Sequence, residues 1–293
     1  MKKILYATDF SKNAEKAFHF ALKLAEKHQA ELVMLHVFDF PPVWGHPYIT
    51  DPKEMTRAAG ISWESKLEEF FEKFKSDIKP TFIAQEHDST VKGILSIIKE
   101  HEPNLVVVGT KGKSLLKEIF IGSTTKALVK KSPAPVLAIP ENAANENFKK
   151  VLYASDFREV DLKALKQLIE LVKPYKDEVK VIHISTENEY KGNEKMEWFK
   201  DMVKDHISYK HISFELFQSD KIFEKLNSYM NQYDFDLMAM LEKERYGIVE
   251  KLFQEDLVSK MEFHTSIPLV SYNEHYLRTT DDQDIKRIDT VGK

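Results

Sequence analysis

The sequence contains no cysteine, which excludes disulfide bonds, thiolate chemistry and metal sites built on cysteine. It also has no segment close to the roughly 20 apolar residues that a membrane-spanning helix needs. Neither sign of charge is in strong excess, since the net charge is −4, so no nucleic-acid-binding surface or basic membrane patch is indicated. Any chemistry must depend on oxygen and nitrogen groups, and we expect neither nucleic acid nor a membrane among the partners.

The first residues are also unlike a secretory signal, although two lysines lie near the start of the sequence. Asp9 follows them after a far shorter apolar stretch than such a signal needs. Together with the lack of cysteine, which fits a reducing compartment, this favours a cytoplasmic protein. The length of 293 residues corresponds to about two domains.

A repeat divides the chain into two copies. Residues 2–10 read KKILYATDF and residues 149–157 read KKVLYASDF, with seven of nine positions identical at an offset of 147. The polar residues between the copies are interpreted as a linker. We therefore predict one domain at 1–141, a second, degenerate copy at 149–272, and a flexible tail at 273–293.

Each copy alternates apolar, β-branched runs with helical patterns. This alternation predicts an α/β fold of two tandem doubly wound (Rossmann-like) domains, each a five-stranded parallel sheet flanked by helices. We expect the strand order 3-2-1-4-5 in each copy. The predicted strands are 3–8, 31–37, 81–85, 104–108 and 135–139, and then 150–154, 178–184, 211–217, 236–240 and 267–271.

Three glycines mark the most distinctive motif. Gly109 and Gly112 directly follow a predicted buried strand, and Gly122 precedes Ser123 and Thr124 at the start of a predicted helix. Glycine allows close backbone approach to a ligand, and the amides of a helix start bind anions. The local pattern predicts a site for phosphate. In a sheet of order 3-2-1-4-5 these glycines converge with Asp9, which follows the first strand.

Two better-known phosphate motifs are excluded. Gly112-Lys113-Ser114 resembles the end of a Walker A loop, but the required first glycine would fall at Val107, inside a strand. A dinucleotide GxGxxG motif fails because the first strand-to-helix turn contains no glycine.

The motif and the repeat resemble the universal stress protein family in its tandem two-domain form. The family signature is glycine, two residues, glycine, nine residues, glycine and then serine or threonine, which Gly109, Gly112, Gly122 and Ser123 match without a gap. The opening strand and turn also look like those of the family, so the resemblance covers residues 1–272. Ala7 departs from the pattern, because some members carry proline there.

The resemblance implies an adenine nucleotide, ATP or else AMP or ADP, with or without Mg²⁺, in the first copy. It implies that Asp9 contacts the ribose or the cation, that the backbone near Val37 meets adenine, and that the glycines and hydroxyls hold phosphates. The implied nucleotide site comprises Ala7, Thr8, Asp9, Val37, Gly109, Gly112, Gly122, Ser123 and Thr124. It also implies pairing through the fifth strands, which gives an intrachain pseudo-dimer and allows a homo-oligomer.

The second copy keeps an acid, Asp156, but has lost the glycines. It reads Leu241-Glu242-Lys243-Glu244 where Gly109 to Gly112 stand, and, if a one-residue insertion is allowed, Glu255-Asp256 is set against Gly122-Ser123. Carboxylates would repel a phosphate, and side chains would fill the space that glycine leaves open. We expect no phosphate binding there.

Several features also have simpler structural explanations. Asp9 could merely cap the first helix, with Ser11 sharing that role, and Lys111 and Lys113 could be solvated. The segment 38–52, absent from the second copy, indicates a lid or pocket wall. A stripe of apolar side chains at helical spacing is interpreted as core: Trp63, Leu67, Phe70, Phe71 and Phe74. The histidines show no metal-ligand spacing.

The sequence thus predicts a stress-response or signalling protein that binds an adenine nucleotide. It offers no clear catalytic base for phosphoryl transfer, so we assign no catalytic residue and no metal ligand. Two alternatives stay open. One is a slow ATPase or autokinase acting through Ser123, and the other is a protein-interaction scaffold without nucleotide.

Overall fold

The computed structural model describes residues 1–39, 52–110, 122–144, 146–176, 178–186, 192–242 and 267–278. The first half contains β1 (Lys3–Ala7), α1 (Lys12–His28), β2 (Glu31–Phe38), α2 (Pro52–Glu72), β3 (Thr81–Glu86), α3 (Thr90–His101), β4 (Leu105–Gly109), α4 (Ser123–Lys131) and β5 (Val136–Ile139). The second half contains β6 (Lys150–Ala154), α5 (Glu159–Val172), a 3₁₀ turn (Lys173–Tyr175), β7 (Glu178–Ser185), α6 (Gly192–His206), β8 (Ile212–Gln218), α7 (Ile222–Gln232), β9 (Leu237–Glu242) and β10 (Leu269–Asn273).

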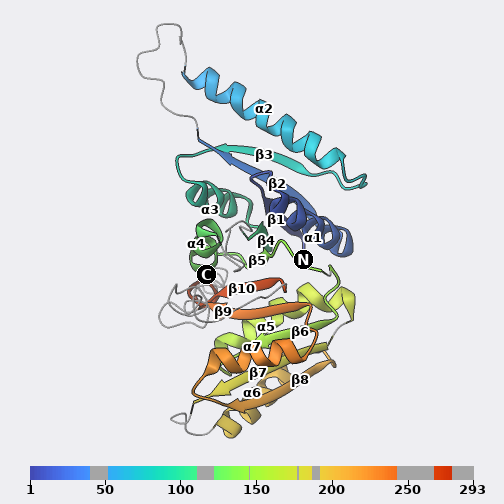
Figure 1. Cartoon of the computed structure of the whole chain (residues 1–293), viewed down its shortest axis with the longest axis vertical. Coiled ribbons are helices and arrows are strands. Elements are labelled where there is room, and N and C mark those ends of the chain that lie inside the picture. Colours follow the sequence, from blue (N-terminus) through green and yellow to red (C-terminus); the bar gives the residue numbers. More distant parts are fainter. Residues whose placement is uncertain are drawn as a thin grey trace, which may run out of the picture.

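All ten strands form one continuous sheet in the order β3-β2-β1-β4-β5-β10-β9-β6-β7-β8. Neighbours within each half pair in parallel, and each half has the order 3-2-1-4-5. The halves meet at β5 and β10, which pair antiparallel with Val270 opposite Leu137. Figure 1 shows the halves stacked along the long axis with this junction at the middle. The predicted fold class and strand order are confirmed.

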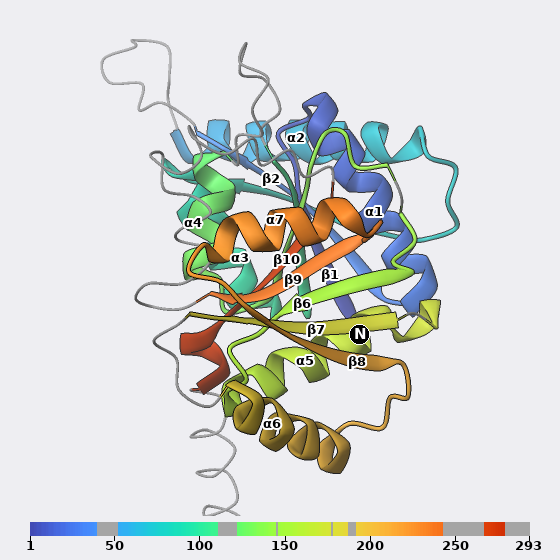
Figure 2. The ribbon, with the colours of Figure 1, turned by 60° about the horizontal axis from the view of Figure 1, so that its bottom comes forward.

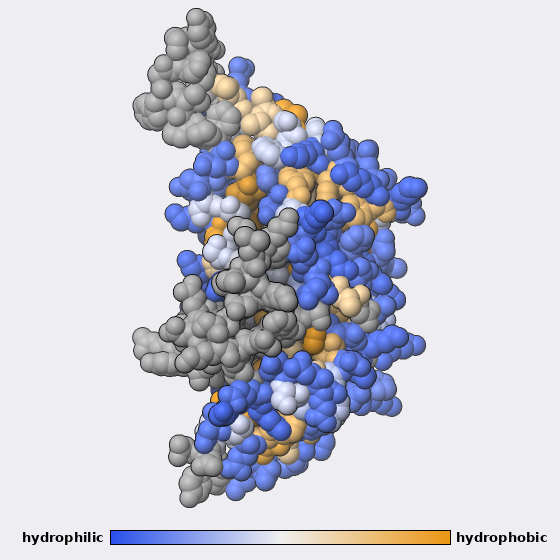
Figure 3. Space-filling view, viewed as in Figure 1, coloured by the Kyte–Doolittle hydropathy of each residue, from blue (hydrophilic) through white to orange (hydrophobic). Residues whose placement is uncertain are grey.

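Helices cover both faces of the sheet because successive strand residues point to opposite sides. Ile4 and Tyr6 belong to the apolar cluster of one face, which includes buried side chains of α1, α2, α5 and α6, whereas Leu5 and Ala7 belong to the cluster of the other face, with those of α3, α4 and α7. Figure 2 shows α7 on one side of β6 and β9, with α5 and α6 on the other. On the face of the molecule that Figure 3 shows, the coloured residues are mainly hydrophilic, and the hydrophobic ones lie in small groups.

The aromatic stripe of α2 is part of the core, as predicted. Leu67 and Phe70 are buried, and the Phe70 ring lies 5.3 Å from that of Phe18 and 5.2 Å from that of Phe74 between centroids. Trp63 stacks on Phe10 with centroids 5.9 Å apart. The stripe therefore holds α2 against α1 and the loop after β1.

The structure differs from the sequence predictions at the carboxyl end of β10. The strand was expected at 267–271 but lies at Leu269–Asn273, and residues 274–278 are helical. The first residues of the segment predicted as a flexible tail are therefore part of the fold. The physical reason is tertiary, because Leu277 is buried and Glu274 is paired with Arg158. Residues 279–293 lie outside the described residues.

The predicted linker between the copies packs against the first half. Ala143 is buried, and the Glu146 carboxylate lies 3.9 Å from Lys16 Nζ and 3.7 Å from Lys23 Nζ of α1. In the part of the chain that the structure describes, none of the helices combines the length and the apolar character that crossing a membrane requires.

Candidate functional site

The predicted site residues come together at the carboxyl ends of β1 and β4. Eight of the nine line one cavity of about 540 Å³: Ala7, Thr8, Asp9, Val37, Gly109, Gly122, Ser123 and Thr124. The ninth, Gly112, lies outside the described residues, as do Lys111, Lys113 and most of the predicted lid at 38–52. The crevice of a doubly wound sheet forms here because the strand order reverses between β1 and β4.

The loop after β1 is fixed by its own hydrogen bonds. The Thr8 hydroxyl accepts from the Phe10 amide at 2.9 Å, and Asp9 Oδ1 accepts from the Ser11 amide at 3.0 Å. Phe10 adopts a left-handed backbone conformation, with φ of 59°. Ser11 caps α1 by accepting from the Ala14 amide at 3.2 Å. The capping role considered for Asp9 thus belongs to Ser11, and Asp9 stands exposed at the cavity rim.

His36 is a site residue that sequence reasoning missed. Its Nδ1 lies 2.8 Å from the Thr8 carbonyl oxygen, which can only accept, so Nδ1 carries the hydrogen. Burial lowers the pKa of His36 below its usual value, and the bond to Thr8 only partly offsets this effect. The neutral ring therefore ties the end of β2 to the loop that carries Asp9. The repeat offered a signal, since His183 makes the same bond to the Ser155 carbonyl oxygen at 2.7 Å.

Gly109 is required by helix packing at the end of β4. A Cβ atom on Gly109 would lie 2.9 Å from the Asn13 carbonyl oxygen and 3.2 Å from the Ala14 amide nitrogen. Such contacts with backbone atoms cannot be relieved by a rotamer change. The Gly109 carbonyl also accepts from the Thr125 hydroxyl at 3.3 Å. This glycine therefore lets the starts of α1 and α4 close around the cavity.

The start of α4 provides the polar end of the cavity. Gly122 is its N-cap residue and supplies no side-chain cap, so the first-turn amides receive no hydrogen bond from that position. Ser123 is exposed, and Thr124 and Thr125 line the same wall. A helix start of this kind carries partial positive charge and favours an anion.

Other lining residues were also not predicted. They are Ser11, Lys12, Asn13, Ala14, Leu35, His36, Thr90, Ile94, Val108, Thr125 and Glu141. Glu141 follows β5, so the rule that ligands bind beyond the carboxyl ends of strands could have found it. Thr90 and Ile94 come from α3, and only the assembled fold brings that helix to the crevice.

The corresponding region of the second half is built differently. The registers of β1 on β4 and of β6 on β9 set Leu241 against Gly109, and Leu241 is buried. Asp156, the counterpart of Asp9, lies 3.8 Å from Arg158 Nε, and Arg158 stands where the first half has Ser11. Lys243, Glu244, Glu255 and Asp256 lie outside the described residues.

A larger cavity of about 750 Å³ lies at the junction of the halves. Its lining mixes Lys99, Glu102, Lys166, Glu170 and Tyr272 and includes none of the motif residues. We place the candidate site in the smaller cavity because the glycines, the helix start and the strand ends coincide there. Among the described residues, no group of three or more histidines and acids is placed to hold a metal ion.

Comparison with known proteins identifies the family of this chain. The model of the universal stress protein family matches residues 1–140. A universal stress protein of Methanocaldococcus jannaschii is 30% identical over 157 residues, which covers 47% of this chain and 94% of that protein. One of Bacillus subtilis is 29% identical over 156 residues, covering 47% and 97%.

The fold of both halves also has a solved counterpart. The crystal structure of a universal stress protein from Archaeoglobus fulgidus covers 92% of this chain and 96% of its own, with a TM-score of 0.63 and 17% identity. At that identity the likeness concerns the fold alone. The relative in Methanocaldococcus jannaschii is matched over nearly its whole length, and the chain therefore belongs to the universal stress protein family.

Proposed function

We propose that the protein is a stress-response or signalling protein that binds ATP, or the related AMP or ADP, in the cavity of its first half. The observation that carries this proposal is the lining of that cavity. Eight residues selected from the sequence for nucleotide binding surround a volume of about 540 Å³, within the range typical of small-molecule sites.

The chemistry of the cavity lining, which has a polar part and an apolar part, supports the proposal. At one end of the cavity, the start of α4, where the N-cap residue Gly122 supplies no side-chain cap, favours phosphate. Elsewhere in the cavity, Leu35, Val37 and Ile94 offer an apolar wall to a base. Asp9 can accept hydrogen bonds from ribose hydroxyls or hold a Mg²⁺ ion that accompanies the phosphates. We assign nucleotide binding to the eight predicted residues that line the cavity and to Gly112, which lies outside the described residues.

We further propose that the two halves, 1–141 and 149–272, act as an internal pseudo-dimer. The antiparallel pairing of β5 with β10 supports this interpretation, because it relates the two five-stranded sheets by an approximate twofold axis. The second half would then serve as a partner domain without nucleotide.

Titration of the protein with ATP and MgCl₂ by calorimetry tests the nucleotide proposal. Gly122→Glu places a carboxylate at the start of α4, and affinity should fall about tenfold or more. Residue 122 has φ of −58°, which any residue adopts, so the variant should fold. Gly60→Glu on α2, which adds the same charge away from the cavity, should bind like the parent. Equal affinity in all three proteins, or no binding by the parent, contradicts the proposal.

Hydrolysis measured on the same samples separates the remaining alternatives. Retention of one nucleotide without turnover supports a binding protein. Multiple turnovers abolished by Ser123→Ala or Asp9→Ala support a slow ATPase or autokinase. Mass spectrometry of any nucleotide retained through purification identifies which one is bound.

A further inference from the structure

Residues 273–278, which we term the C-terminal strap, contact both halves of the molecule. The strap begins at the last residue of β10, the strand that pairs with β5 of the first half and β9 of the second. It continues as the helical residues 274–278. Because the strap lies at the junction, it can be held by contacts with each half, which we call its two anchors.

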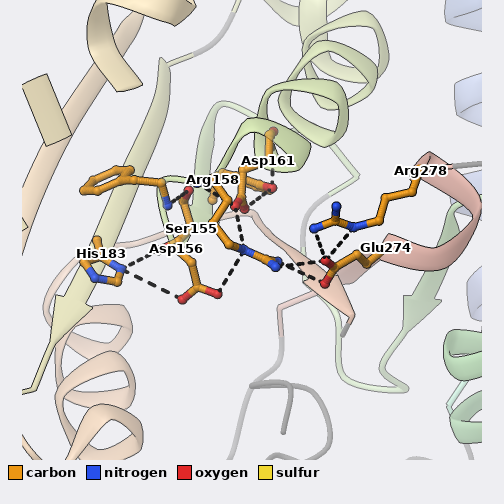
Figure 4. Close-up of polar contacts among 9 residues, drawn as sticks. Ser155, Asp156, Arg158, Asp161, His183, Glu274 and Arg278 are labelled. Atoms are coloured by element: carbon orange, nitrogen blue, oxygen red, sulfur yellow. Dashed lines mark hydrogen bonds and ion pairs between the residues drawn. The ribbon is translucent and has the colours of Figure 1, made fainter. Parts of the chain in front are cut away.

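The anchor in the second half is an ion cluster around Arg158. The guanidinium donates to both carboxylate oxygens of Glu274 at 2.9 and 3.1 Å, a bidentate geometry. Its Nε lies 3.8 Å from Asp156 and 3.7 Å from Asp161. Figure 4 shows Arg158 between Asp156 and Glu274, with Arg278 donating to Glu274 from the other side.

This cluster is better shielded than an ordinary surface ion pair. The Glu274 side chain is 12% exposed and that of Asp161 is 1% exposed. Burial opposes ionisation of Glu274, but hydrogen bonds from Arg158 and Arg278 outweigh it and keep the pKa of Glu274 below its usual value. Two further contacts hold the strap on α5, where Lys163 Nζ donates to the Leu277 carbonyl at 2.8 Å and the Leu277 side chain is buried.

The anchor in the first half is on α4. Asn273 Nδ2 donates to the Lys130 carbonyl oxygen at 2.7 Å, in the last turn of that helix. The other end of α4 is the wall of the cavity, formed by Ser123, Thr124 and Thr125. One short helix therefore lies between the strap and the cavity.

We propose that the C-terminal strap couples α4, and with it the wall of the cavity, to the Arg158 cluster of the second half. The two anchors lie on adjacent residues, Asn273 and Glu274. When one of them is released, the backbone of the other is held less firmly in place. The first half has Ser11 at the position of Arg158 and so cannot form this cluster. The coupling is a property of the protein without ligand and does not depend on the proposed nucleotide.

Hydrogen exchange of the ligand-free full chain, followed by mass spectrometry, tests this coupling. Glu274→Gln removes the charge that Arg158 pairs with, while Asp156 and Asp161 still neutralise the guanidinium. Exchange should become about tenfold faster or more in residues 269–278 and also in α4. Asn273→Ala removes the first-half anchor together with the bond that Asn273 Oδ1 accepts from the His275 amide at 3.1 Å, so exchange should rise both in α4 and in residues 274–278.

The matched control is Glu224→Gln, which breaks the exposed Lys221–Glu224 pair at 3.0 Å on α7. It should leave exchange in the strap and in α4 unchanged. If Glu274→Gln accelerates exchange only within residues 269–278, the strap is a local latch and the coupling is wrong. If exchange in the Glu274→Gln variant is the same as in the parent protein at every residue, the proposal is also wrong.

Discussion

Gly109 illustrates how one residue serves both the fold and the candidate site. Its place after a buried strand predicted close approach of a ligand to the backbone. The structure adds that the missing Cβ makes room for the Asn13 carbonyl and the Ala14 amide at the start of α1. A sequence cannot reveal this reason, because α1 and β4 are far apart along the chain.

The first prediction concerns this contact. Gly109→Ala should lower the free energy of unfolding in urea by about 1–3 kcal/mol, because backbone atoms must move to admit the methyl group. Gly60→Ala is the control, since a Cβ there would meet only the edge of Phe38 at 4.0 Å. That variant, in the interior of α2, should be neutral or stabilising by up to about 1 kcal/mol. Equal effects at the two positions would contradict the explanation.

A second prediction follows from the buried imidazole of His36. Burial lowers the pKa of His36 below the ordinary histidine value of about 6.5, so the unfolded chain takes up this proton before the folded protein does as the pH falls. Stability should therefore fall as the pH is lowered through that value. His36→Gln can still donate to the Thr8 carbonyl but does not titrate, so its unfolding free energy should change less between about pH 7 and pH 5.5. An unchanged pH dependence would show that His36 does not contribute.

At the scale of elements, the periodic patterns predicted strands and helices well. The strands of the first half begin and end within one residue of their expected limits, because each is an apolar run with turn residues beside it. β10 was displaced by two residues, since its carboxyl end is held by pairing of Asn273 with Glu242 and by the strap. Local sequence contains no record of those contacts.

The third prediction concerns the stripe on α2. Phe70 is 6% exposed and contacts the rings of Phe10, Phe18 and Phe74, so Phe70→Ala should lower the free energy of unfolding by about 3–5 kcal/mol. Ile61→Ala, at a position 56% exposed on the same helix, is the control and should change it by less than about 1 kcal/mol. Urea titrations followed by circular dichroism measure both. A small loss in Phe70→Ala would argue that the stripe serves something other than packing.

For the whole molecule, the continuous sheet makes the two halves structurally interdependent. Buried residues of both halves, such as Leu137 of β5 and Val270 of β10, belong to the same apolar cluster. The junction between β5 and β10 is therefore a stretch of core as well as a backbone ladder. Cooperative unfolding of the two halves is the expected consequence.

Tryptophan fluorescence in urea tests this fourth prediction. In a Trp44→Phe background, Trp63 reports on the first half and Trp198 on the second, and each can be isolated by replacing the other with Phe. We expect both tryptophans to report the same midpoint. Val270→Asp, which buries a charge at the junction, should lower both midpoints together. Separate midpoints in the parent protein would indicate halves that unfold independently.

The duplication and the alternation of strands and helices could be read from the sequence alone, because they depend on a repeat and on local periodicity. The strand order followed from the doubly wound fold class, and the residues around the cavity from the glycine spacing together with the family resemblance. The assembled fold was needed to show that Thr90 and Ile94 line the cavity and that Gly109 accommodates α1. It also decided that Arg158 pairs with Glu274. Such contacts join residues distant along the chain, and their partners are selected by packing rather than by any local pattern.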